Sequence, residues 1–232
     1  MNVAENIERV QERIRRACLR SGRAVEGVRL VAVSKTKPAE AIRQAYAAGL
    51  REFGENRVQE AAGKRKELEG VDAVWHLIGH LQSNKAKQAC QLFDAIHSLD
   101  SLHLAEKIDR AAASLGRKMP VLIEVHLGKE SSKFGVEEDG LVRLAEQVGA
   151  LPSVELQGLM TLPPFFADPQ EARPFFRRLR DLAGRIESRK LPRVSMRELS
   201  MGMSHDFEIA IEEGATIVRV GTAIFGERQH NP

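Results

Sequence analysis

The stretch Leu30-Val31-Ala32-Val33-Ser34-Lys35-Thr36-Lys37-Pro38 predicts a β-strand that leads into a helix. Its first four residues are apolar and include two β-branched valines, which favours a strand. Proline suits the first turn of a helix, because its missing N–H would have no partner there. Alternation along the strand places Val31, Val33 and Lys35 on one face. We therefore expect a βα unit with Lys35 at the carboxyl end of its strand.

Short β-branched runs alternate with longer amphipathic segments along the rest of the chain, which is typical of a parallel sheet in an α/β protein. The predicted strands are residues 29–33, 52–56, 74–79, 95–99, 121–127, 156–161, 197–201 and 216–220. Eight is the number that closes a (β/α)8 barrel of the TIM type, whose interior is filled by side chains. The pattern predicts this fold.

The whole chain, residues 1–232, is expected to form a single domain, because barrels of roughly 200 to 250 residues are common. The barrel itself should occupy residues 29–226. An additional helix is predicted over residues 1–21, before the first strand, where it could replace the missing last helix of the barrel. Three glycines are expected to end helices in the left-handed conformation, namely Gly49, Gly116 and Gly149.

Composition excludes several classes of protein. Hydrophobic residues make up 43% of the chain and charged residues 29%, and no apolar run approaches the roughly 20 residues of a membrane span. The net charge of +3 is spread along the helices, which argues against a nucleic-acid partner. The N-terminus lacks the pattern of a targeting signal, and Cys18 and Cys90 have no metal or disulfide spacing. We expect a cytoplasmic protein without a membrane or metal partner.

Lys35 is the first candidate for chemistry. Active sites of barrel enzymes lie at the carboxyl ends of the strands, where this residue is predicted. A lysine that is poorly solvated, or lies near another cation, has a lowered pKa, and its free amine can attack an aldehyde or ketone. Lys37 is the alternative, but it lies past the strand and next to Pro38. We favour Lys35.

The loops after the seventh and eighth strands predict an anion site. In barrels these loops commonly bind phosphate through backbone amides and hydroxyls. Ser200, Gly221 and Thr222 follow the two strands and fit this role, while Ser204 could cap the following helix. Taken separately, Gly202 and Gly221 could equally be residues of simple turns.

Arg219 interrupts the apolar run Ile217-Val218-Arg219-Val220 in a strand that should be covered on both faces. A buried guanidinium needs an acceptor, because its burial without one costs several kcal/mol. The acceptor could be a carboxylate or the ring nitrogen of a bound cofactor. Because arginine stays protonated, it would keep such a nitrogen unprotonated and weaken the ring as an electron sink.

Other polar residues also fall near predicted strand ends. They are Asn56, His76, Glu124 and His126. Each could line a pocket, although a histidine in a strand is often a hydrogen-bonded structural residue. The seven histidines show no metal-ligand spacing, so no metal site is predicted.

A set of ordered motifs closely resembles the pyridoxal phosphate homeostasis protein family over nearly the whole chain. The motifs are Ala32-Val33-Ser34-Lys35-Thr36-Lys37-Pro38, Phe53-Gly54-Glu55-Asn56 with Val58-Gln59-Glu60, Trp75-His76-Leu77-Ile78-Gly79, Leu81-Gln82-Ser83-Asn84-Lys85, Gly158-Leu159-Met160, Leu199-Ser200-Met201-Gly202-Met203-Ser204 and Val218-Arg219-Val220-Gly221-Thr222-Ala223-Ile224-Phe225-Gly226. One departure is His80, where proline is expected; it lies beside the motif.

The resemblance implies a barrel similar to the N-terminal domain of alanine racemase, with pyridoxal 5'-phosphate (PLP) held as a Schiff base on Lys35. It further implies phosphate contacts from Ser200, Gly221 and Thr222, with Arg219 near the pyridine nitrogen. Lys133, in the loop after the fifth strand, could help to receive or release the cofactor. The expected cofactor-binding residues are Lys35, Asn56, His76, Met160, Ser200, Met201, Arg219, Gly221 and Thr222.

Three functions would use such a site. As in the family, a carrier would buffer PLP or deliver it to PLP-dependent apoenzymes, with effects on amino-acid and keto-acid balance and no catalytic residue. An amino-acid racemase would need a second base, which that fold takes from a tyrosine of a further domain and partner subunit. The chain's single tyrosine, Tyr46, falls in a predicted helix. A Schiff-base aldolase has no ring nitrogen for Arg219. We expect a carrier, working as a monomer.

Overall fold

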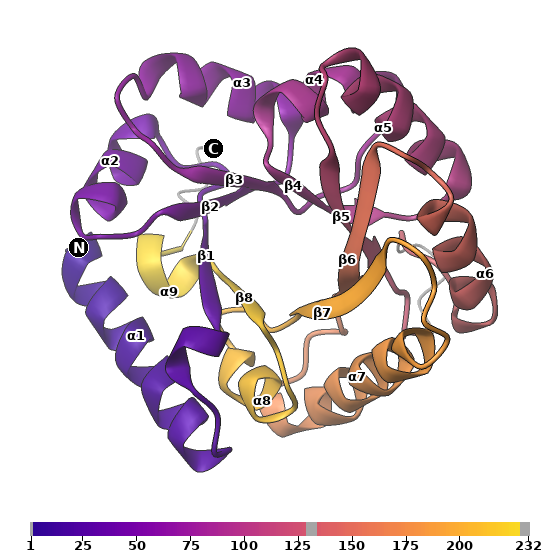
Figure 1. Ribbon diagram of the computed structural model, residues 1–232. Helices are drawn as coiled ribbons and strands as arrows, with labels where there is room; N and C mark the ends of the chain where they lie inside the picture. Colours follow the sequence, from indigo (N-terminus) through magenta and orange to yellow (C-terminus); the bar gives the residue numbers. More distant parts are fainter. Residues whose placement is uncertain (1, 129–133, 228–232) are drawn as a thin grey trace.

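Eight parallel strands hydrogen-bond in chain order and close on themselves as β1 pairs with β8 (Figure 1). The computed structural model describes residues 2–128 and 134–227. The strands are β1 Arg29–Val33, β2 Glu52–Glu55, β3 Val74–Leu77, β4 Ala95–Leu99, β5 Met119–Glu124, β6 Val154–Met160, β7 Val194–Ser200 and β8 Ile217–Val220. The predicted TIM-type barrel is confirmed.

Helices surround the barrel, and most connect one strand to the next (Figure 1). Those between strands are α2 Ala39–Ala47, α3 Val58–Glu67, α4 Ala86–Leu92, α5 Leu102–Ser114, α6 Glu138–Gly149, α7 Arg173–Glu187 and α8 Phe207–Glu212. The short α9, Thr222–Phe225, follows β8. Their apolar faces pack on the outside of the sheet and form the main core. Within the described residues, no helix combines the length and apolar character that a bilayer crossing needs.

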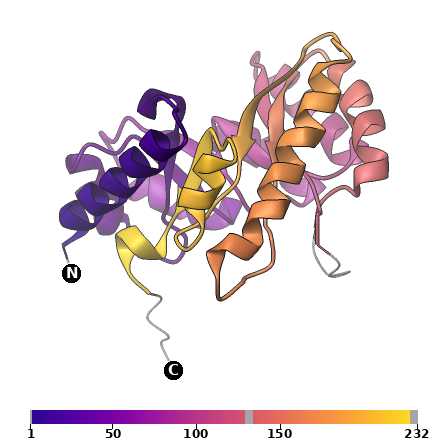
Figure 2. The ribbon, with the colours of Figure 1, turned by 90° about the horizontal axis from the view of Figure 1, so that it is seen from below.

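The predicted N-terminal helix is α1, Val3–Arg20. Asn2 caps it by accepting hydrogen bonds from the backbone N–H groups of Ala4 and Glu5. Its buried residues recur at helical spacing, and they pack against α2, α8 and α9. Figure 2 shows α1 beside α8 and α9. The helix therefore covers the seam between the last strand and the first, where α9 is too short to do so.

Several strand boundaries differ from the prediction. Strand β2 ends at Glu55 and β3 at Leu77, before the predicted Asn56 and Gly79. Strand β5 ends at Glu124 instead of Leu127, because the chain turns there to pair Val125 with Val136. The extra residues belong to the loops that form the carboxyl mouth of the barrel. An apolar run continues past the last ladder hydrogen bond, so composition alone overextends the strand.

The three glycines differ in conformation. Gly49 and Gly116 have positive φ values, as expected for helix ends. Gly149 does not, so the prediction of a left-handed cap there is wrong: it is the last residue of α6. A Cβ atom at this position would lie 2.7 Å from Cγ2 of Val194 and 2.9 Å from the carbonyl oxygen of Pro192. Close packing of α6 on the start of β7 explains this glycine.

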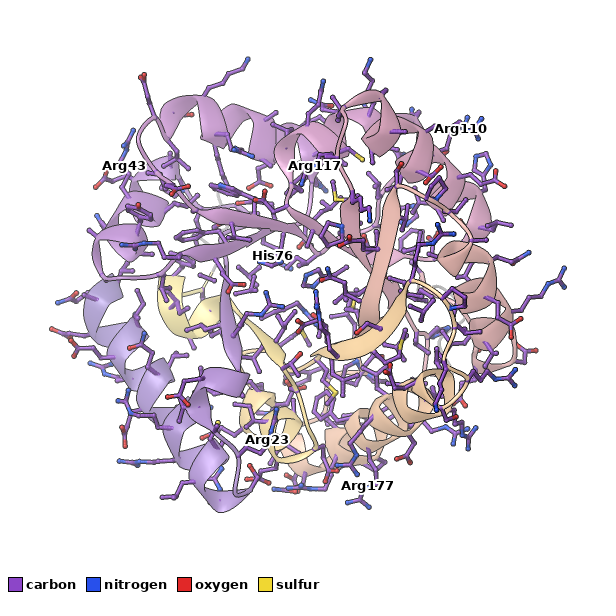
Figure 3. All side chains as sticks on the ribbon, viewed as in Figure 1. Arg23, Arg43, His76, Arg110, Arg117 and Arg177 are labelled. Atoms are coloured by element: carbon purple, nitrogen blue, oxygen red, sulfur yellow. The ribbon has the colours of Figure 1, made fainter. Side chains whose placement is uncertain are left out.

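The barrel interior is divided between apolar and polar side chains. Four residues form a small apolar cluster separate from the main core: Val31, Leu122, Met160 and Ile217. His76 on β3 points into the same interior (Figure 3), where it meets His97 of β4. The interior therefore contains a hydrogen-bonded polar path beside its apolar filling.

Candidate functional site

A cavity of about 310 Å³ lies at the carboxyl ends of the strands. Five of the predicted cofactor-binding residues line it: Lys35, Asn56, Arg219, Gly221 and Thr222. Apolar side chains complete the wall, among them Ile78, Leu162 and Phe165. The volume falls within the range of roughly 300 to 1,000 Å³ that small-molecule sites occupy.

The backbone on both sides of Lys35 is held by a largely buried charge cluster, which we define as Glu55, Glu60 and Lys64. Lys64 donates to Glu55, to Glu60 and to the carbonyl oxygen of Ser34, each at 2.7 Å. The Ser34 hydroxyl donates to Glu55 at 2.6 Å, and the N–H of Thr36 donates to Glu60 at 2.5 Å. The residues before and after Lys35 are thus tied to one cluster.

Thr36 has a φ of +64°, which is uncommon for a residue other than glycine. The hydrogen bond from its N–H to Glu60 helps to hold this conformation. Strained backbone of this kind persists only where the surroundings enforce it, and it concentrates at functional sites. The turn therefore presents Lys35 to the cavity.

Lys37, the alternative nucleophile, also lines the cavity. Its ammonium group donates to the carbonyl oxygen of Glu227 at 2.8 Å. This contact ties the β1–α2 loop to the chain after α9, so Lys37 has a structural role in holding these two segments together.

Arg219 is almost fully buried, and its guanidinium reaches the cavity from β8. It donates to the hydroxyl of Ser200 at 2.6 Å and to the carbonyl oxygen of Thr161 at 2.9 Å. Burial lowers its pKa to about 10, partly offset by the charges of Glu124 and Asp206, so it stays charged near neutral pH. Among the residues that the structure describes, no carboxylate forms an ion pair with it. Its hydrogen-bond acceptors within the described residues are a hydroxyl and a carbonyl oxygen.

The loops after β7 and β8 are joined by Ser204. Its hydroxyl oxygen accepts from the N–H of Gly221 at 3.2 Å and from that of Ala223 at 3.3 Å. A Cβ atom on Gly221 would lie 3.2 Å from the carbonyl oxygen of Val33, so glycine lets this loop approach the end of β1. The close approach brings the two ends of the chain's predicted site, Lys35 and Thr222, to one cavity.

Four predicted residues do not line this cavity: His76, Met160, Ser200 and Met201. All four are buried. The Ser200 hydroxyl faces His97 and Arg219 inside the barrel, and His76 is hydrogen-bonded to Glu52 and His97. Sequence position alone did not distinguish a side chain facing the mouth from one facing the interior. Lys133 lies outside the described residues.

Sequence reasoning missed two residues that support the site. Lys64 lies four residues after Glu60 on α3, a spacing typical of helical ion pairs, and this could have marked it. His97 lies in the apolar run of β4, where a polar residue signals a buried partner.

Glu124, on β5, is buried, and burial raises its pKa from 4.5 to about 7 despite the charge of Arg219. The folded protein therefore binds this proton more tightly than the unfolded chain. Its contribution to stability is present below about pH 4.5 and is lost as the pH rises through about 7. The shift corresponds to about 3 kcal/mol.

Urea unfolding of the Glu124→Gln variant near pH 5 and pH 8 checks this expectation. Between the two conditions the free energy of unfolding of the wild-type protein should fall by about 2.5 kcal/mol more than that of the variant. Glu155→Gln, at a half-buried carboxylate on β6, is the control and should show the same pH dependence as the wild type. Equal pH dependence of Glu124→Gln and wild type would contradict the assignment.

Comparisons with known proteins agree with this geometry. Residues 2–229 match the alanine racemase N-terminal domain family. The chain is 49% identical over 230 residues to the pyridoxal phosphate homeostasis protein of Aquifex aeolicus, covering 99% of this chain and 100% of that protein.

Solved structures show the same relationship. PipY of Synechococcus elongatus, whose structure has PLP bound, superposes with a TM-score of 0.84 at 44% identity, over 97% of this chain and all of PipY. An alanine racemase of Clostridium difficile shares the fold, with a TM-score of 0.77 at 14% identity over 99% of this chain and 58% of the racemase. The ordered motifs, the barrel and these matches together show that this chain belongs to the pyridoxal phosphate homeostasis protein family.

Proposed function

We propose that this chain binds PLP in the cavity at the carboxyl ends of its strands, with the cofactor joined covalently to Lys35, and that it buffers or delivers the cofactor. The observation that carries the proposal is the convergence of Lys35, Arg219, Gly221 and Thr222 on one cavity. PipY, which has PLP bound, is 44% identical over nearly the whole chain.

The chemistry of the cavity fits this group. PLP supplies an aldehyde that condenses with a lysine amine, and Lys35 lies on the cavity wall. Arg219 can donate to a ring nitrogen, and Ile78 and Leu162 offer apolar surface to a ring. Thr222 and the backbone of the β8–α9 loop are suited to a phosphate. The proposed side-chain contacts with PLP do not include the four residues that lie outside the cavity lining: His76, Met160, Ser200 and Met201.

Racemisation would need a second base, and the position of Tyr46 favours a carrier over a racemase. Tyr46 lies on α2, where its ring stacks against the guanidinium of Arg51 at 4.0 Å. It does not line the cavity. The likeness to alanine racemases is at 14% identity, so it supports the fold alone.

Addition of PLP to the purified protein, followed by borohydride reduction and peptide mapping, tests the proposal. We expect a new visible absorption band that reduction removes, and one modified lysine at position 35. The absence of both band and label after adding PLP would contradict cofactor binding. Rapid alanine racemisation by the loaded sample would contradict the carrier role.

We further propose that the carrier acts in the cytoplasm as a monomer, handing PLP to PLP-dependent apoenzymes. Cys18 and Cys90 are buried free thiols, and burial raises the pKa of Cys90 to about 11, which keeps it protonated and unreactive. Light scattering at several concentrations, with and without PLP, checks the oligomeric state. A stable dimer in either condition would contradict the monomer.

A further inference from the structure

Four consecutive hydrogen bonds run through the barrel interior from the amino end of β2 to the cavity. Glu52 Oε2 lies 3.0 Å from His76 Nε2, and His76 Nδ1 lies 3.0 Å from His97 Nε2. His97 Nδ1 lies 2.9 Å from the Ser200 hydroxyl, which accepts from Arg219 at 2.6 Å. We call this series the Glu52–Arg219 chain. It links side chains from β2, β3, β4, β7 and β8.

The members between the ends are shielded from water. His76 and His97 are each 1% exposed and Ser200 is fully buried. Each ring nitrogen of the two histidines contacts one member of the chain. A buried polar hydrogen without an acceptor costs about 1 to 3 kcal/mol, so the arrangement of protons that satisfies every member is strongly preferred.

The Arg219 end determines that arrangement. A guanidinium can only donate, so Ser200 accepts from it and must place its own hydrogen on another atom. The acceptor beside Ser200 is His97 Nδ1, which therefore carries no proton. Burial first, and then the charges of Arg219 and Arg29, lower the pKa of His97 well below its usual value, so the ring is neutral. Its proton is on Nε2.

The proton positions of His76 and Glu52 follow from that of His97. His97 donates from Nε2 to His76 Nδ1, which must be unprotonated, so His76 donates from Nε2 to Glu52. Glu52 must then be an ionised acceptor. Burial would raise the pKa of Glu52, but the hydrogen bond from His76 and the charge of Arg29 lower it below its ordinary value. Both ends of the chain require the same direction.

We propose that Glu52, His76, His97 and Ser200 are positioning residues for Arg219, holding its guanidinium toward the cavity through one directional chain of hydrogen bonds. The proposal rests on the proposed function, in which Arg219 faces the cofactor ring. It gives His76 and Ser200 a role through Arg219, without direct contact with the cofactor. Glu52, which lies at the amino end of β2 and thus at the opposite mouth of the barrel, would therefore also help to position Arg219 in the cavity.

Side-chain NMR of the protein without PLP tests the proton arrangement directly. Two-bond ¹H–¹⁵N correlation spectra distinguish the two neutral tautomers of histidine from the charged form. We expect each of the two rings to carry its proton on Nε2 and none on Nδ1. A proton on Nδ1 of His97 or of His76 would overturn the proposal. This measurement does not depend on cofactor binding.

Glu52→Gln tests whether the far end of the chain matters. Arg219 still imposes the direction, and the amide oxygen can still accept from His76, but the acceptor has lost its charge, so the ¹⁵N resonances of His76, and to a smaller extent those of His97, should shift. Glu198→Gln is the matched control: Glu198 also pairs with Arg29, at 3.0 Å, but has no hydrogen bond to His76. Unchanged histidine spectra in Glu52→Gln, or equal changes in both variants, would contradict the chain.

Ser200→Ala tests the effect on Arg219. Loss of this acceptor should weaken PLP binding about tenfold, the size expected for one hydrogen bond to a charged group, and shift the absorption maximum of the bound cofactor. Ser98→Ala removes an equally buried serine on β4 that donates to Gly79 at 2.7 Å, outside the chain, and should leave both unchanged. Equal affinity and spectra for Ser200→Ala and wild type would overturn the proposal.

If wild-type protein takes up no PLP, the proposed function fails. The histidine spectra of the protein without PLP still show whether the Glu52–Arg219 chain has the expected proton arrangement.

Discussion

Replacement of Lys35 by alanine is expected to abolish covalent retention of PLP, reducing the borohydride-trapped cofactor from stoichiometric to background. The cavity wall and Arg219 remain in this variant, so weak, reversible binding should persist and be lost on dialysis. The physical reason is that only an amine can form the covalent link to the aldehyde. Intact-mass spectrometry after reduction measures the effect.

Lys37→Ala is the matched control, since Lys37 lines the same cavity but its ammonium group binds the carbonyl oxygen of Glu227. We expect this variant to trap PLP as the wild type does. Trapping that survives in Lys35→Ala and disappears in Lys37→Ala would reverse the assignment. Equal partial trapping in both would show that neither lysine is the specific nucleophile.

Gly158→Ala is expected to destabilise the fold by about 4 kcal/mol or more, among the largest effects of a single substitution. Gly158 lies on β6, where the pairing registers with both β5 and β7 shift. A Cβ atom here would lie 1.8 Å from the carbonyl oxygen of Glu198. This contact is far below any van der Waals separation, so β6 and β7 would have to move apart.

Gly184→Ala is the control for this substitution. Gly184 is exposed on α7, and a Cβ atom there meets nothing within 4 Å. Because alanine favours a helix more than glycine does, this variant should be more stable by up to about 1 kcal/mol. Urea unfolding of both variants gives the comparison. A Gly158→Ala variant as stable as the wild type would show that the strands can separate at little cost.

Lys35→Ala and Gly158→Ala should affect the site in different ways. Lys35 acts at the cavity, whereas a displaced β7 would carry Ser200 with it and weaken its hydrogen bond to Arg219. Loss of cofactor binding in Gly158→Ala would therefore be expected alongside the loss of stability. Lys35→Ala should change cofactor retention much more than the free energy of unfolding.

The architecture was predictable from the sequence because it depends on local periodicity. Alternation in 29–33 and the proline after it predicted the first strand and the place of Lys35, and the N-terminal helix follows from its apolar spacing. The ordered motifs predicted the family. These features are written along the chain within a few residues of each other.

The direction of individual side chains at the strand ends was not predictable in this way. Ser200 follows the pattern of a phosphate loop, yet its hydroxyl turns inward to His97 and Arg219. His97 interrupts the apolar run of β4, but that run does not identify its partner His76, which is 21 residues away in the sequence. Such contacts depend on the register between strands, which barrel closure sets.

The amino-acid sequence alone was enough to predict an eight-stranded α/β barrel of the pyridoxal phosphate homeostasis protein family, with Lys35 at a strand end. Which polar residues face the cavity, and which join the Glu52–Arg219 chain, depends on the folded barrel. Buried hydrogen bonds must be satisfied by whatever the closed barrel brings within about 3 Å, and those neighbours come from strands far apart in the sequence.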